Sequence, residues 1–178
     1  SNGDPVTSQD FVRSWERTLR PETASEYAGQ LYYIHNARPF NEGKVKDFRE
    51  VGVQAPDPFT LIVTLDNPTP FFLDLTAFNT LLPVHMPSVE ACEKRGESFM
   101  KPGKCIGNGA FVLKEWRLFD RIRIEKNPRY WNAANVHMKT VDILPIAKPM
   151  TAFNFYSTGL ADAMIDKTLT PTPLLNEL

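Results

Sequence analysis

Proline is the residue that most constrains this chain, because 15 of its 178 residues are prolines, about 8% against roughly 5% in average proteins. Proline lacks a backbone donor and is excluded from helix interiors and central strands. The sequence therefore predicts short helices and strands joined by many ordered loops. With 42% hydrophobic and 23% charged residues, the composition is globular and excludes disorder, collagen and coiled coil. At about 150 residues per domain, the length predicts one domain or two small ones.

Charge argues against nucleic acid as a partner, and hydropathy argues against a membrane-spanning segment. Lys and Arg number 20 and Asp and Glu 21, so the net charge of −1 provides no basic field for nucleic acid. No run approaches the roughly 18 apolar residues that span a bilayer, and Ser1–Pro5 lacks the pattern of a signal peptide. The chain also opens at Ser1 directly into a turn, with no preceding element to pack against. We therefore expect an internal piece of a longer protein.

The strongest local signal predicts a helix over residues 8–19. Thr7 is positioned to cap the first turn, and Asp10, three residues on, to reach back to the cap. Apolar residues then recur on one face, and Pro21 ends the helix.

The rest of the pattern mixes short helices and strands without a regular βαβ rhythm, which is typical of a mixed α/β (α+β) chain. Pro83 and Pro87 exclude helix over 81–87, where we expect an extended crossing. The other predicted elements are helices at about 25–35, 71–78, 88–95 and 150–157, a hairpin at 51–65, strands at 110–116, 121–126, 141–144 and 163–165, and a terminal helix after Pro171 and Pro173.

The sequence contains no arrangement that predicts catalysis or metal binding. His35, His85 and His137 are isolated, without the spacing that lets two rings share a metal ion. Gly107 and Gly109 precede a predicted strand instead of opening a helix, which favours a turn or close backbone packing over a phosphate site. No nucleophile, base and orienting group converge, so we expect a protein that is not an enzyme and uses no cofactor.

The only two cysteines, Cys92 and Cys105, lie on either side of a loop that contains Gly96 and Gly103. A pair of this kind forms a disulfide in an oxidising compartment, whereas elsewhere it remains as two unreactive thiols. Both alternatives stay open at this point.

Aromatic residues provide the one positive signal for binding. Twelve Phe, five Tyr and three Trp make up 11% of the chain. Most must belong to the core, and the surplus is suited to lining a groove, because flat rings hold a ligand with little loss of rotamer entropy. Tyr27, Leu31 and Ile34 form one such stripe, which we interpret as core in preference to a ligand platform.

Five stretches, taken as motifs in order, resemble the extracytoplasmic solute-binding proteins of peptide-type ABC transporters. The opening 1–15 is similar to that family's signature, Trp, Ser/Thr, Asp/Asn, Gly, x, Pro, Val, Thr, Ala/Ser, x, Asp, Phe/Val, without its leading Trp. The other four are Thr-Ala-Ser-Glu-Tyr-Ala at 23–28, Leu-Asp-Asn-Pro-Thr-Pro-Phe-Phe at 65–72, Gly-Asn-Gly-Ala-Phe-Val-Leu at 107–113 and Lys-Asn-Pro-Arg-Tyr-Trp at 126–131. The resemblance covers essentially the whole chain and is nearest to the oligopeptide-binding branch.

This resemblance implies a periplasmic-binding-protein-like fold of type II, present only in part. Family members are far longer and have two lobes that close on the ligand, plus an extra small domain. Residues 1–86 then correspond to most of the extra domain, and residues 87–178 to part of the first lobe, while the second lobe lies outside the chain.

The resemblance also implies a function. Family members hold an extended peptide between the lobes through main-chain hydrogen bonds and deliver it to a membrane permease after a hinge closure. It implies a monomer in the bacterial periplasm, or one anchored by lipid on the outer face of the membrane. Two alternatives remain, namely the ligand-sensing domain of a transcriptional regulator with the same fold, and a family member specific for a dipeptide, nickel chelate, haem or sugar.

The same resemblance implies which residues bind the ligand, by matching positions in the motifs. Tyr27 matches a tyrosine that lines the family's peptide site, and Phe78 with Asn79 matches a pocket wall. Ile165 with Asp166 matches a segment that runs beside the peptide. Oligopeptide binders often carry Tyr-Asn at this last place, so the resemblance implies a different pocket chemistry here.

Overall fold

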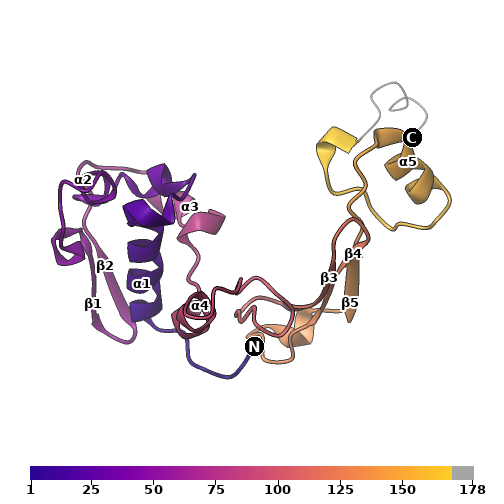
Figure 1. Cartoon of the computed structure of the whole chain (residues 1–178), viewed down its shortest axis with the longest axis horizontal. Coiled ribbons are helices and arrows are strands. Elements are labelled where there is room, and N and C mark those ends of the chain that lie inside the picture. Colours follow the sequence, from indigo (N-terminus) through magenta and orange to yellow (C-terminus); the bar gives the residue numbers. More distant parts are fainter. Residues whose placement is uncertain (170–178) are drawn as a thin grey trace.

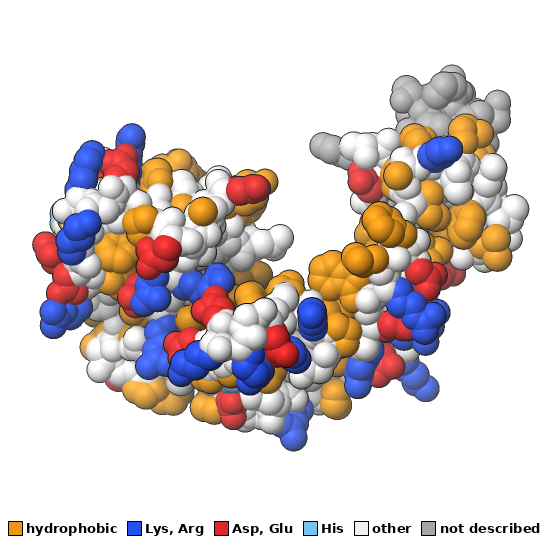
Figure 2. Space-filling view, viewed as in Figure 1, with side chains coloured by type: hydrophobic (Ala, Val, Ile, Leu, Met, Phe, Trp, Pro, Cys, Tyr) orange, Lys and Arg blue, Asp and Glu red, His pale blue; other side chains and the backbone are white. Residues whose placement is uncertain are grey.

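The computed structural model describes residues 1–169, which form two arms joined at the base (Figure 1). The N-terminal body holds helices α1 to α3 and a β-hairpin, and the second arm holds a three-stranded sheet and helix α5. A wide hollow separates the two arms in the space-filling view (Figure 2). No helix of the described part is long and apolar enough to cross a membrane.

Helix α1 spans Ser8–Leu19, as the sequence predicts. The carboxylate of Asp10 accepts a hydrogen bond of 2.7 Å from the backbone amide of Thr7, so the predicted capping contact is present. Trp15 and Leu19 are buried on the inner face of the helix, and the indole Nε1 of Trp15 donates to the carbonyl of Leu81 at 2.8 Å.

One hydrophobic core fills the N-terminal body around α1. The hairpin of β1 (Val53–Asp57) and β2 (Thr60–Val63) confirms the predicted one. The short helices α2 (Ala37–Asn41) and α3 (Phe72–Leu75) also belong to this body (Figure 1). The buried core consists of Trp15, Leu19, Ala28, Leu31, Ile34, Ala37, Phe40, Val51, Val53, Phe72 and Leu81.

The single helix predicted at 25–35 is wrong. The chain forms a 3₁₀ turn at Ala28–Leu31, and Ile34 then makes an isolated β-bridge with Leu65. The amide of His35 donates to the carbonyl of Thr64 at 2.9 Å, and its carbonyl accepts from Gly52. Pairing with the hairpin therefore takes the backbone groups that a helix would need, which overrides local helix propensity.

Two other predicted helices differ at their ends. Only Phe72–Leu75 of the predicted 71–78 is α-helical, and a 3₁₀ turn follows at Asn79–Leu81. Helix α4 spans Met86–Glu93 and begins two residues before the predicted start at 88. The prediction was wrong because Pro87 lies in the first turn, where a missing N–H costs no hydrogen bond.

The second arm is built on an antiparallel sheet in the order β3-β4-β5. The strands are β3 (Phe111–Arg117), β4 (Arg121–Lys126) and β5 (Thr140–Ile143), close to the predicted ones. Helix α5 spans Pro149–Ser157. The strand predicted at 163–165 is wrong, because this segment has no strand partner among the described residues. The predicted helix after Pro171 lies outside them.

Helix α4 connects the two arms. It packs on α1, where the guanidinium of Arg17 lies 2.9 Å from a carboxylate oxygen of Glu93. The core of the N-terminal body ends at Leu81, before α4 begins. The division of the chain at residues 86 and 87 stays a prediction.

The two cysteines are free thiols in the structure, Cys92 buried in α4 and Cys105 half-buried in the following loop. The described structure thus corresponds to the second of the two alternatives that the sequence left open.

We expect Trp15→Phe to lower the free energy of unfolding by about 1–3 kcal/mol, because it leaves the buried Leu81 carbonyl without its donor. The matched control is Trp131→Phe, since the side chain of Trp131 is 85% exposed and its loss leaves no cavity. Urea unfolding followed by circular dichroism measures both. Equal midpoints for the two variants would contradict the role assigned to Trp15.

We also expect two titratable thiols in denatured protein without reductant. In the native protein, Cys92 is protected from alkylation until unfolding, and burial raises the pKa of the Cys105 thiol, so Cys105 reacts more slowly at pH 8 than a fully exposed thiol. Mass spectrometry after alkylation counts the labels. A denatured, unreduced chain that takes up no label contains the disulfide instead.

Candidate functional site

Two of the five expected ligand-binding residues form an exposed aromatic pair. The ring centroids of Tyr27 and Phe78 lie 5.5 Å apart with the planes tilted by 60°. Tyr27 is 54% exposed, Phe78 is also exposed, and Asn79 follows directly on the same surface segment. These rings can still stack against a further planar or apolar group.

Local backbone geometry explains why Tyr27 leaves the core stripe to which the sequence assigned it. Tyr27 precedes the 3₁₀ turn at Ala28–Leu31 and has φ −108° and ψ 17°, outside helical geometry. Leu31 and Ile34 are fully buried, so the core interpretation is confirmed for them. It is wrong for Tyr27, whose ring lies at the surface.

Sequence reasoning missed a second aromatic pair, made by Tyr33 and Phe71. Their ring centroids lie 5.3 Å apart in an edge-to-face arrangement, and both rings are exposed. The sequence signal for this pair is that each ring belongs to two adjacent aromatic residues, Tyr32-Tyr33 and Phe71-Phe72. Tyr32 is half-buried and Phe72 buried, so the neighbouring ring in each case points outward.

The remaining two expected residues, Ile165 and Asp166, lie in the other arm, after α5. The side chain of Ile165 is 84% exposed. Asp166 accepts hydrogen bonds from the hydroxyl and backbone amide of Thr168, at 2.7 and 2.8 Å, and these bonds lower its pKa. The structure thus does not bring Ile165 and Asp166 together with the Tyr27–Phe78 pair.

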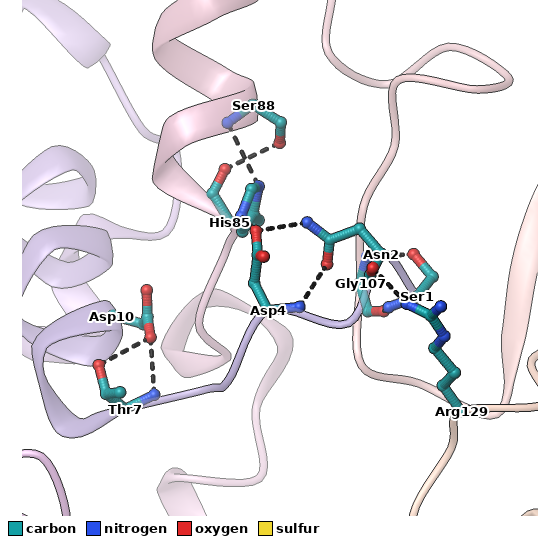
Figure 3. A network of polar contacts seen from close by, with 9 residues as sticks. All are labelled: Ser1, Asn2, Asp4, Thr7, Asp10, His85, Ser88, Gly107 and Arg129. Atoms are coloured by element: carbon teal, nitrogen blue, oxygen red, sulfur yellow. Dashed lines mark hydrogen bonds and ion pairs between the residues drawn. The ribbon is translucent and has the colours of Figure 1, made fainter.

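A polar network connects the N-terminal segment to α4 (Figure 3). The carboxylate of Asp4 lies 2.9 Å from Nε2 of His85 and also accepts from the side-chain amide of Asn2. The backbone amide of Ser88 donates to Nδ1 of His85 at 3.3 Å. An amide can only donate, so Nε2 carries the proton and donates to Asp4. His85 therefore connects the N-terminal segment to the first turn of α4.

A second set of hydrogen bonds connects the motif at 107–113 with the motif at 126–131. The buried side chain of Asn127 donates to the carbonyl of Gly109 at 2.9 Å and accepts from the amide of Arg129 at 3.0 Å. Its backbone amide donates to Ala110 at 2.8 Å. A β-carbon at Gly107 or Gly109 would have open space around it, so close packing does not explain these glycines.

Charged and titratable side chains of the described residues occur mostly in pairs. The described residues contain no group of three His, Cys, Asp or Glu side chains that is placed to hold a metal ion. His35 forms a pair with Asp66 at 2.7 Å. The groove between α1 and α4 is lined by charges of both signs, including the ion pair of Arg20 with Glu16 at 2.8 Å. It offers no field of one sign to a ligand.

Comparison with known proteins identifies the family. The family model "Bacterial extracellular solute-binding proteins, family 5 Middle" matches residues 1–177. The chain belongs to this family. It is 43% identical over 164 residues to the periplasmic oligopeptide-binding protein OppA of Escherichia coli K12, covering 91% of this chain and 30% of that one.

Other family 5 members show the same relationship. The structure of Haemophilus influenzae OppA in complex with RPPGFSPFR superposes with a TM-score of 0.83 at 37% identity, over 89% of this chain and 30% of that one. A probable deoxycholate-binding periplasmic protein of E. coli K12, YgiS, is 39% identical over 164 residues, again 91% of this chain and 30% of the relative. The chain thus spans about 30% of the length of these relatives and shares their fold over that part.

We expect Tyr27→Ala to change the free energy of unfolding by less than about 1 kcal/mol, because the ring is largely at the surface. The control Leu31→Ala removes a fully buried side chain four residues away and should cost about 2–5 kcal/mol. Urea unfolding separates the two. A loss at Tyr27 as large as at Leu31 would show that the ring is part of the core.

Proposed function

We propose that this chain contributes one wall of the peptide site in the substrate-binding component of an ABC transporter. The observation that carries the proposal is the exposed Tyr27–Phe78 pair, with Asn79 beside it. Phe78 follows α3, which lies on the side of the N-terminal body that faces the other arm (Figure 1). We infer that a ligand between the arms meets this aromatic pair.

The chemistry of such a surface suits peptides of varied sequence. Rings that are already held against each other contact apolar atoms of a ligand with little further loss of rotamer entropy. The amide side chain of Asn79 has both a donor and an acceptor for a peptide backbone. Contacts of this kind recognise an extended main chain more than a particular side chain. The relative solved with RPPGFSPFR supports peptide as the ligand class.

Ile165 and Asp166 belong to the same proposal, as contacts from the second arm. Ile165 presents an apolar side chain to solvent, and Asp166 provides a carboxylate whose pKa is lowered by hydrogen bonds from Thr168. An apolar and an acidic group replace the Tyr-Asn of many oligopeptide binders. We infer a preference here for ligands with an apolar or basic side chain.

The wider role follows from the family and stays part of the proposal. The relatives are periplasmic binding proteins, and none of those compared is named as an enzyme. We propose an extracytoplasmic binding protein without catalytic activity that hands its ligand to a membrane permease.

A steroid is the second candidate ligand, because one relative at 39% identity is a probable deoxycholate-binding protein. The broad apolar face of a bile acid also fits against exposed rings. Peptide is favoured because Asn79 adds hydrogen-bonding groups suited to a main chain.

The test is calorimetry on a chimaera in which this chain replaces the matching 164-residue segment of E. coli OppA. We expect the chimaera to bind members of a mixed library of short peptides, and the isolated chain to bind weakly or not at all. Tyr27→Ala and Phe78→Ala should weaken binding about tenfold, which is roughly 1.4 kcal/mol each.

The matched control is Phe59→Ala, since Phe59 is an exposed ring in the turn between β1 and β2, on a different part of the body. It should leave the affinity unchanged. Equal peptide affinities for all three variants would reject the aromatic wall, and binding of deoxycholate with no peptide binding would replace the ligand class.

A further inference from the structure

The dipeptide Asn-Gly occurs twice in the chain, at Asn2-Gly3 and at Asn108-Gly109. An asparagine before glycine is prone to lose its side-chain amide, because glycine has no β-carbon to hinder attack by its own backbone nitrogen. The attack also requires that the asparagine side chain and this backbone nitrogen are free to approach each other. The two sites share the same dipeptide, so the tertiary structure decides which of them reacts.

The first site, Asn2-Gly3, is held by several hydrogen bonds. The side-chain amide of Asn2 donates to the carboxylate of Asp4 at 2.5 Å, and its side-chain carbonyl accepts from the backbone amide of Asp4 at 3.2 Å. The guanidinium of Arg129 donates to the backbone carbonyl of Asn2. Figure 3 shows these contacts around Asn2. A reaction at Asn2 therefore requires that several bonds break first.

The second site, Asn108-Gly109, is exposed and lies outside the helices and strands. Within residues 1–169, neither the side chain of Asn108 nor the backbone amide of Gly109 has a hydrogen-bond partner. A β-carbon at Gly109 would meet no atom within 4 Å, so the backbone has room to turn. Both groups that must meet in the reaction are thus free to move.

The carbonyl of Gly109, in contrast, has a fixed partner. It accepts a hydrogen bond of 2.9 Å from the side chain of Asn127, which is 1% exposed. The backbone amide of Asn127 donates to the carbonyl of the next residue, Ala110, at 2.8 Å. A change in the length of the backbone before Gly109 therefore disturbs the partner of a buried side chain.

We propose that Asn108 is a site of spontaneous deamidation in the folded protein and that Asn2 is protected. The backbone nitrogen of Gly109 loses its proton to hydroxide and forms a bond to Cγ of Asn108. The bond from Cγ to the side-chain nitrogen breaks, and this nitrogen takes a proton from water and leaves as ammonia. Water then opens the cyclic imide at one of its two carbonyl groups, which leaves aspartate or isoaspartate at position 108.

The two products differ in their effect on Asn127. Both add a negative charge at an exposed position, and aspartate leaves the backbone otherwise unchanged. Isoaspartate adds one carbon atom to the backbone directly before Gly109. This insertion moves the Gly109 carbonyl away from Asn127, and a buried amide without its acceptor is costly. Formation of isoaspartate thus weakens the connection between the motif at 107–113 and the motif at 126–131.

Peptide mapping tests the proposal, because trypsin places the two asparagines in separate peptides, 1–13 and 105–114. The chain is kept in mildly alkaline buffer, and mass spectrometry follows the mass increase of each peptide. Asn108 should react about tenfold faster than Asn2 in the native chain, since the bonds at Asn2 raise the barrier there. In urea the two rates should become similar. In the chimaera with E. coli OppA, Asn108 should react as fast as in the isolated chain.

Two glycine variants form a matched pair, since an added β-carbon meets open space at both positions and neither backbone is left-handed. Gly109→Ala should slow the reaction at Asn108 about tenfold, because the new methyl group hinders the attacking nitrogen. Gly107→Ala lies before Asn108 and should leave the rate unchanged. Asp4→Ala should speed up the reaction at Asn2, because it removes the acceptor of the side-chain amide.

Thermal unfolding distinguishes the two products. Asn108→Asp has the new charge without the longer backbone, so its thermal midpoint should stay within about one degree of that of the fresh chain. A chain aged until position 108 is mainly isoaspartate should unfold several degrees lower. Equal midpoints for the aged and the fresh chain would overturn the effect on Asn127.

Three other results would overturn the proposal. If Asn108 stays intact in the native chain and reacts only in urea, the fold protects it. If Asn2 and Asn108 react equally fast in the native chain, the contacts with Asp4 and Arg129 give no protection. If Asn108 reacts in the isolated chain and not in the chimaera, polypeptide outside these 178 residues covers the site.

Discussion

The buried indole of Trp15 is the contact on which the N-terminal body and its aromatic surface both depend. Trp15 lies at the centre of the inner face of α1, and its N–H donates to the carbonyl of Leu81. Leu81 ends the 3₁₀ turn that begins at Asn79, next to Phe78. One hydrogen bond in the core therefore fixes the segment that carries two of the proposed ligand contacts, and a buried bond to a carbonyl is costly to break.

The second arm is held by a different kind of interaction. Its sheet has few buried side chains, and the joints around it are polar, with Asn127 bonded to Gly109 and Asp4 bonded to His85. Asp4, Gly109 and Asn127 belong to the motifs by which the chain resembles its family, and His85 contacts one of them. Apart from Tyr27 and Phe71, whose rings are exposed, the motif residues whose contacts are described thus belong to the core or act as structural joints. This is why the motifs identify the family more securely than they identify a ligand.

Exposed apolar side chains occur on both arms. On the N-terminal body, the exposed rings of Tyr27 and Phe78 and those of Tyr33 and Phe71 contact each other in pairs. The sheet of the second arm carries apolar side chains in rows across its three strands, and these rows have no second layer on them within residues 1–169. Exposed apolar side chains are thus grouped in two ways here, as ring pairs that we propose as a ligand wall in one arm and as rows across a sheet in the other.

The sequence by itself determined the elements whose signals are local. These are α1 with its cap, the two hairpins, helix α5 and, through ordered motifs, the family. Only the tertiary structure decided that residues 25–35 do not form a helix, because Ile34 and His35 pair with a hairpin thirty residues away along the chain. It also decided that Tyr27 meets Phe78 while Ile165 and Asp166 lie in the other arm. Local periodicity records which side chains avoid water, whereas the partner of a backbone group or of an exposed ring depends on segments distant in sequence.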